Sequence, residues 1–229
     1  MNTEKKKESP LLSLVLNIAL PTLILMKFSD DESLGPVWGL VVALAFPLGY
    51  GIYDFTKQSK VNFISVLGFA SILLTGAMGL LELDPHWIAV KEAAVPLIIG
   101  LAVIISVWTP FPLVKKLLYN NQILNIEKVD ALLIENNHKA SFEKRLIKSS
   151  YFIALSFLLS SVLNYALAKY FLISAPGTAE FNAELGKMNA FSIPVIAIPS
   201  TIIMIGVLLW LIKSIKKFTG LEMEEILNT

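Results

Sequence analysis

Cysteine is absent from this chain, and charged residues are scarce. The absence of cysteine excludes disulfides, thiolate catalysis and zinc or iron–sulfur sites with cysteine ligands. Asp, Glu, Lys and Arg together make up 16% of the residues, whereas soluble domains carry about 25%. The formal net charge is only +1, so there is no overall basic field that would attract nucleic acid. The few charges therefore matter through their positions.

Enzyme motifs are also missing. The two histidines, His86 and His138, lie far apart in the sequence, and there is no H-E-x-x-H, no glycine-rich phosphate loop and no G-x-S-x-G. Lys91 and Glu92 could form an acid/base pair, but adjacent residues on a helix do not face one another. We therefore expect no enzyme activity and no cofactor or metal.

Long apolar segments fill most of the chain. Hydrophobic residues make up 55% of it and the mean hydropathy is +0.67. A helix of about 18 or more apolar residues crosses roughly 30 Å of hydrocarbon. The sequence predicts an all-α integral membrane protein with one transmembrane domain over residues 1–229. Its six helices are expected at about 10–28, 34–54, 62–82, 87–109, 149–173 and 192–213.

The charge of the connections alternates along the chain. Lysines occur near the N-terminus, after the second helix, in the long connection at about residues 113–148 and in the C-terminal tail, whereas the other connections are mostly acidic. The positive-inside rule then places both termini in the cytoplasm. The first apolar run is too long for the core of a signal peptide and lacks a cleavage site, so we expect it to be retained. The prediction is a bundle of three hairpins.

An internal repeat is predicted from two helices. Residues 38–51 and 87–100 both read W-x2-V-x3-A-x-P-L-x2-G. An even number of crossings separates the two copies, so a duplicated hairpin would give repeats of parallel topology, as in some transporters.

Proline and small residues occur at regular places in the expected helices. Five prolines lie within or at the start of these helices: Pro21, Pro47, Pro96, Pro194 and Pro199. They either bend helices that line a cavity or reflect the general frequency of proline in membrane helices. Small residues recur on single faces of three helices: Ala45, Gly49, Ser71, Thr75, Gly79, Ala89, Ala93 and Gly100. These faces predict close packing between helices of the chain, and the alternative is a homodimer interface.

Glu92 is the main candidate for a binding site. It lies five residues after Trp87, which is about 7–8 Å along a helix, and it borders the small-residue face. An ionisable group inside a membrane helix is costly and is a functional candidate by default. Lys91 is rotated by about 100° and is expected to extend to the outer headgroups. In the alternative, the helix begins later and both residues lie in the wet interface.

Other polar residues are weaker candidates. Asp54 marks the end of the second helix or, with Tyr50, Tyr53 and Lys60, forms a polar vestibule. Three residues are expected to hydrogen-bond between helices: Asn17, Thr75 and Asn164. Such bonds contribute only about 0.6 kcal/mol on average.

The spacing of apolar residues predicts an amphipathic helix in the connection at about residues 113–148. Ile126, Val129, Leu132 and Leu133 recur at helical spacing among charged residues. It is expected on the cytoplasmic surface, either as a connector or as a partner-binding element. Residues 221–227 are expected to form another short helix.

One region resembles a known family. The stretch from Trp87 to Lys91, followed by an apolar helix and the sequence PLVKKLL at 112–118, resembles the aromatic-x3-Lys helix and the P-L-[IV]-x-[KR]-x-L element of intracellular septation protein A. It also resembles the uncharacterised relatives that are sometimes labelled major-facilitator transporters. The resemblance covers about residues 40–120 and implies a bacterial inner membrane and a role in septation or envelope maintenance. It supplies no catalytic residues, although Lys91 matches the motif lysine. The family has fewer spans and lacks the long connection.

Two functions are compatible with these features. One is a small-solute transporter with a cavity lined by proline-containing helices and Glu92 as a proton or cation site. The other is an envelope-organising or lipid-interacting protein that binds a membrane-protein partner and does not need the charge at residue 92.

Overall fold

The computed structural model describes residues 10–58, 63–110, 112–121 and 123–228, and this part of the chain is helical without a β-strand. Its one strand-like feature in these ranges is an isolated antiparallel bridge between Leu124 and Leu227. The predicted all-α class is therefore confirmed.

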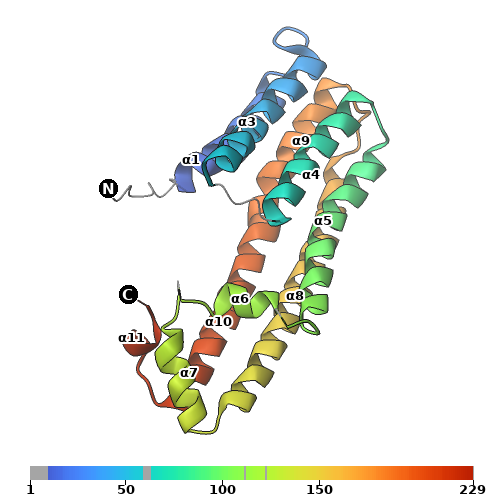
Figure 1. Cartoon of the computed structure of the whole chain (residues 1–229). Helices are drawn as coiled ribbons and strands as arrows, with labels where there is room; N and C mark the ends of the chain where they lie inside the picture. Colours follow the sequence, from blue (N-terminus) through green and yellow to red (C-terminus); the bar gives the residue numbers. More distant parts are fainter. Residues whose placement is uncertain (1–9, 59–62, 111, 122, 229) are drawn as a thin grey trace, which may run out of the picture. The chain divides into compact units, whose positions relative to one another are not determined.

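The helices follow one another with short connections (Figure 1). In chain order they are α1 (Pro10–Leu14), the π-helical segment η1 (Val15–Ala19), α2 (Leu20–Lys27), α3 (Gly35–Gln58), α4 (Phe63–Leu80), α5 (Pro85–Ser106), α6 (Leu113–Leu118), α7 (Ile126–Glu135), α8 (Lys139–Phe171), α9 (Ala179–Ser192), the π-helical segment η2 (Ile193–Ala197), α10 (Ile198–Thr219) and α11 (Met223–Ile226).

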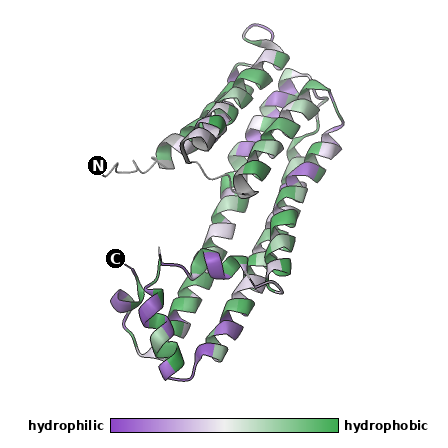
Figure 2. Ribbon diagram, in the orientation of Figure 1, coloured by the Kyte–Doolittle hydropathy of each residue, from purple (hydrophilic) through white to green (hydrophobic). Residues whose placement is uncertain are grey.

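Four helical stretches in the described ranges are long and apolar enough to cross a membrane. They are Gly35–Tyr53, Pro85–Ser106, Lys139–Phe171 and Ala179–Thr219. Two shorter apolar helices cover Val15–Lys27 and Val66–Leu80. In Figure 2 hydrophobic residues dominate α3, α5 and α10, and hydrophilic residues gather on α7 and α11. Helices of this length and composition are typical of a membrane protein. The six crossings and their orientation stay predictions.

Two predicted connections are shorter than expected because helices extend into them. α8 begins at Lys139 rather than near residue 149, because Phe142 and Leu146 bury apolar side chains one turn apart. α9 occupies most of the expected outer connection before the last helix. The Thr178 hydroxyl caps it by accepting from the Phe181 N–H, and Phe181, Leu185 and Met188 are buried at helical spacing.

The prolines lie where the helical backbone is irregular or begins. Pro21 follows η1 at the start of α2, and Pro194 lies within η2, with Pro199 at the start of α10. Pro47 and Pro96 lie inside α3 and α5. Each interior proline removes one backbone hydrogen bond, and π-helical turns are common where the ladder is interrupted. The predicted positions of these residues within helices are confirmed.

The chain divides into two compact units. Unit 1 comprises residues 1–95 and 163–195, and unit 2 comprises residues 96–162 and 196–229. Each has its own core of buried apolar residues. The single transmembrane domain expected from the sequence stays a prediction.

In unit 1, α2 packs against α3 and α9, and α3 packs against α4. Glycines permit close approach at these contacts. A Cβ atom at Gly186 of α9 would lie 3.1 Å from the Thr22 carbonyl oxygen, and one at Gly79 would lie 2.6 Å from a methyl carbon of Leu40. The small face of α4 therefore packs as predicted. Ala45 and Gly49 of α3 are exposed instead, so their predicted packing within the chain is wrong.

In unit 2, the predicted amphipathic helix is α7, and its Val129 and Leu133 are buried. Tyr119 donates to Asp130 over 2.6 Å, and Lys139 pairs with the same carboxylate. These contacts join the end of α6, α7 and the start of α8. The predicted short helix near the C-terminus is α11, whose Ile226 is fully buried.

Candidate functional site

A cavity of about 310 Å³ lies in unit 1 among η1, α2, α3, α4, α5 and α9. Apolar side chains and two of the predicted helix prolines, Pro21 and Pro47, form part of its wall. Its polar residues come from several helices and are Asn17, Ser71, Thr75, Lys91, Glu92, Asn189 and Ser192. A mostly apolar cavity with a few converging polar groups is the usual form of a small-molecule site.

Lys91 is the most buried charged residue of this cavity, with 7% of its surface exposed. Its ammonium donates to the Thr75 hydroxyl over 2.6 Å and to the Ser71 hydroxyl over 3.2 Å. Ser71 and Thr75 lie one turn apart on α4, so both hydroxyls face the same neighbour. The expectation that Lys91 extends to the headgroups is therefore wrong, because α4 offers hydrogen-bond acceptors inside the unit.

Glu92 also accepts from Lys91, whose ammonium in addition lies 3.5 Å from the Ser71 carbonyl oxygen. The Lys91 Nζ and Glu92 Oε1 atoms are 2.5 Å apart, and the Glu92 side chain is 22% exposed. The expectation that these neighbours do not face one another is wrong, because the flexible lysine side chain bends back toward the carboxylate. Burying either charge alone would cost several kcal/mol, so the opposite charges of the two side chains compensate one another inside an apolar bundle.

The opposite polar groups come from η1 and α9. The Asn17 amide nitrogen donates to the Ser13 carbonyl over 2.9 Å and to the Ser13 hydroxyl over 3.1 Å. The predicted bond from Asn17 to another helix is therefore wrong, because both acceptors lie one turn earlier on the same helical segment. Ser192 donates to the Asn189 carbonyl over 2.6 Å. Asn189 and Ser192 were not predicted as site residues, although both are polar and lie at the start of the last apolar run.

Three of the remaining sequence candidates, Tyr50, Tyr53 and Asn164, do not line this cavity. Tyr50 is partly buried and Tyr53 about half exposed near the end of α3. Asp54 belongs to α3, but its side chain lies outside the described residues, as does Lys60. Asn164 is partly buried on α8. The cavity therefore brings together Asn17, Lys91 and Glu92 of the predicted set, while the vestibule at Asp54 stays a prediction.

The cavity suits a proton, a monovalent cation or a small polar molecule. Among the residues that the structure describes, no group of three or more His, Asp or Glu side chains could hold a metal ion. All three ammonium hydrogens of Lys91 have acceptors close by, whereas the Glu92 carboxylate has a second oxygen that can accept. A ligand would therefore meet Glu92 before Lys91.

Comparisons of this chain with protein-family models, curated proteins and solved structures find no match. The resemblance to intracellular septation protein A stays a prediction.

Proposed function

We propose that this protein moves a small polar or cationic solute across a bacterial inner membrane and binds it in the unit 1 cavity. The observation that carries the proposal is the Lys91–Glu92 ion pair on the wall of that cavity. A structural scaffold has no need of an ion pair among apolar helices, because apolar residues of similar volume pack there at equal or lower free energy. Ionisable residues in such places mark ion and substrate pathways.

Glu92 is the binding residue in this proposal, and Lys91 is its counter-charge. A proton or a cation at Glu92 would weaken the attraction between the two side chains. Lys91 would then depend on Ser71 and Thr75 alone, so occupancy of Glu92 changes the contacts between α5 and α4. This couples ligand binding to helix packing, which a transporter requires if it is to respond to its solute.

The first test is the thermal stability of the purified protein against a library of metabolites, toxic cations and bacterial lipids. A ligand that binds the folded state stabilises it by about 2.7 kcal/mol at one hundred times its dissociation constant. We expect a saturable shift with one water-soluble solute. In proteoliposomes, uptake of that solute should be lost in Glu92→Gln and kept in the matched control Glu180→Gln, which changes an exposed residue of α9.

Unaltered uptake in a folded Glu92→Gln protein would rule out this assignment. Shifts by lipids alone would favour the second function, an envelope-organising or lipid-interacting protein. The observation in its favour is the exposed small face of α3, where no atom lies within 4 Å of a Cβ built at Gly49. Crosslinking in native membranes should then recover a reproducible partner, and the charge at residue 92 should be dispensable.

A further inference from the structure

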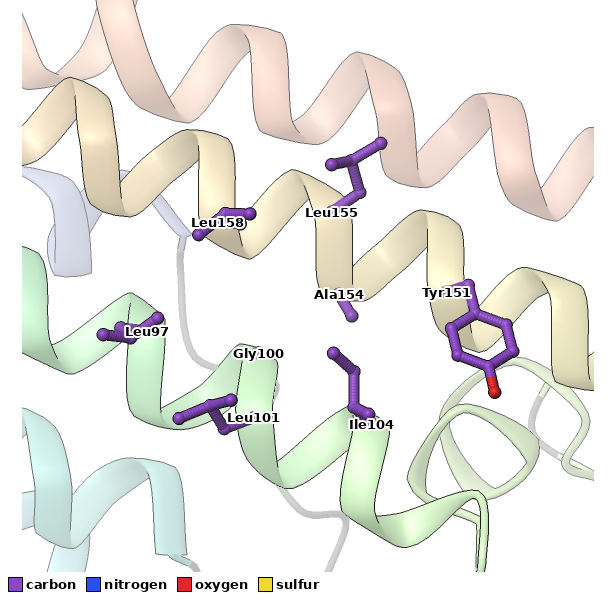
Figure 3. A pocket seen from close by; sticks show the side chains of 8 residues that line it. All are labelled: Leu97, Gly100, Leu101, Ile104, Tyr151, Ala154, Leu155 and Leu158. Atoms are coloured by element: carbon purple, nitrogen blue, oxygen red, sulfur yellow. The ribbon is translucent and has the colours of Figure 1, made fainter.

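An apolar groove of about 240 Å³ lies between α5 and α8 within unit 2 (Figure 3). Its floor is formed by small residues. A Cβ atom at Gly100 would lie 3.0 Å from the Phe157 Cβ and 3.4 Å from the Ala154 carbonyl oxygen, so the two helices approach closely there. In Figure 3 the side chains of Ala154 and Ile104 point toward one another across the gap.

The walls of the groove are exposed leucines. Leu97 and Leu101 flank it on α5, and Leu155 and Leu158 flank it on α8; between 39% and 61% of each side chain is accessible. The groove is therefore open along its side, and it is smaller than the roughly 300–1,000 Å³ of typical drug-sized sites. A narrow, open and largely apolar groove between two apolar helices fits a hydrocarbon chain better than a compact polar solute.

One end of the groove becomes polar within two turns of α8. Tyr151 lines that end and is about half exposed. Lys148 and Lys144 precede it by three and seven residues, which places them on the same helix face. Both lysines are exposed, and the described part of the chain provides no ion-pair partner for either. The face therefore changes from apolar to aromatic to cationic.

The neighbouring helix has the same order. Ile104 of α5 lies at the Tyr151 end of the groove, and Trp108 follows in the turn directly after α5 ends at Ser106, with 73% of its surface exposed. Trp and Tyr are enriched at the level of the lipid headgroups. Tyr151 and Trp108 thus mark the depth at which the hydrocarbon ends and the headgroups begin.

We propose that unit 2 binds a phospholipid with an anionic headgroup, with an acyl chain in this groove and the phosphate between Lys144 and Lys148. The charge of the free lysines selects an anionic headgroup, and the groove selects a hydrocarbon chain. This proposal does not depend on solute transport, because it concerns different residues in a different unit.

The test is the thermal stability of the detergent-purified full chain on titration with phosphatidylglycerol, with phosphatidylcholine as the zwitterionic comparison. Phosphatidylglycerol should stabilise the protein saturably at concentrations at which phosphatidylcholine does not, and added salt should weaken its effect. The double variant Lys144→Gln/Lys148→Gln should bind phosphatidylglycerol roughly thirty-fold more weakly, since each lysine near an anionic lipid contributes about 1 kcal/mol.

The matched control is Lys169→Gln/Lys187→Gln, which removes the same charge from exposed positions of α8 and α9 in unit 1 and should leave the affinity unchanged. Glycerol phosphate, which has the headgroup charge without acyl chains, should give no shift. Equal effects of the two lipids, equal losses in the two double variants, or full stabilisation by glycerol phosphate would each overturn the proposal.

Discussion

At the scale of single residues, the Lys91–Glu92 pair makes a prediction about stability. Glu92→Leu leaves the ammonium of Lys91 buried with only hydroxyl and carbonyl acceptors, and we expect it to lower the free energy of unfolding by on the order of 3 kcal/mol. Lys91→Met should also be destabilising. The double variant should recover part of the loss, because it removes both charges and leaves apolar side chains of similar size.

A double-mutant cycle measures this effect, with unfolding followed by circular dichroism in detergent. We expect a coupling energy of about 1–3 kcal/mol between the two residues. A loss in the double variant equal to the sum of the two single losses would show that the two charges act independently. The ion pair would then not stabilise the fold.

Gly186 provides a second prediction at this scale. Gly186→Ala places a methyl group 2.8 Å from Met26 Cγ and 3.1 Å from the Thr22 carbonyl oxygen. Overpacking of this kind costs about 1–3 kcal/mol, so the thermal midpoint should fall. The matched control is Gly49→Ala on α3, which meets no atom within 4 Å and should keep or raise the midpoint through better helix propensity. An equal fall in both variants would contradict the packing of α2 on α9.

At the scale of elements, Asp130 makes the joint between α6, α7 and α8 sensitive to acid. Burial raises the pKa of Asp130, but hydrogen bonds from Lys139 and Tyr119 and the positive charges of Lys139 and Lys115 outweigh burial, so the pKa lies below its ordinary value of 3.8. Burial and the bond to Asp130 raise the pKa of Tyr119, so its phenol remains a donor. A lowered carboxyl pKa contributes stability above pH 3.8 that is lost as the pH falls through the folded-state pKa.

The corresponding measurement compares thermal midpoints of the wild type and Asp130→Asn between about pH 6 and pH 3. The wild type should be more stable at the upper end, and the difference should shrink as the pH falls below about 3.8. Glu127→Gln, on an exposed position of the same helix, should track the wild type at both ends. A difference that stays constant with pH would show that Asp130 stabilises through packing alone.

The positions of helices were predictable from the sequence where hydropathy alone determines where a helix begins and ends. α3, α4 and α5 begin and end close to the expected residues, because long apolar runs bounded by polar turns leave few alternatives. The early start of α8 and the whole of α9 were not predicted. Both depend on tertiary burial of residues in mixed sequences, which local hydropathy does not reveal.

The candidate site was partly predictable for a similar reason. A carboxylate in an apolar run singles out Glu92 without a structure, and Asn17 stood out in the same way. The position of Lys91 was predicted wrongly, because a helical wheel gives the direction of a Cβ atom but not the path of a four-carbon side chain. The Lys91 side chain turns inward because the hydroxyls of Ser71 and Thr75, on another helix, accept hydrogen bonds from its ammonium.

At the scale of the whole molecule, the orientation in the membrane is testable because the chain has no native cysteine. Single cysteines can therefore be introduced without first altering the protein. The alternation of basic and acidic connections predicts that the N- and C-termini and the α6–α7 region lie in the cytoplasm. The turn before α3 and the start of α9 should lie on the opposite side.

Four exposed positions test this arrangement: Asp31, Asn121, Glu180 and Glu224. With a membrane-impermeant maleimide added to intact cells, Asp31→Cys and Glu180→Cys should be labelled directly, whereas Asn121→Cys and Glu224→Cys should react only after the membrane is permeabilised. The decisive pair is Asp31 and Asn121, because three of the six predicted crossings, an odd number, separate them and therefore place them on opposite sides of the membrane. Labelling of both positions from outside would rule out the six-crossing topology. It would also contradict the cytoplasmic placement of the lysines beside the α5–α8 groove. Labelling of Asp31 alone would leave that placement intact and make the anionic inner leaflet the source of the lipid.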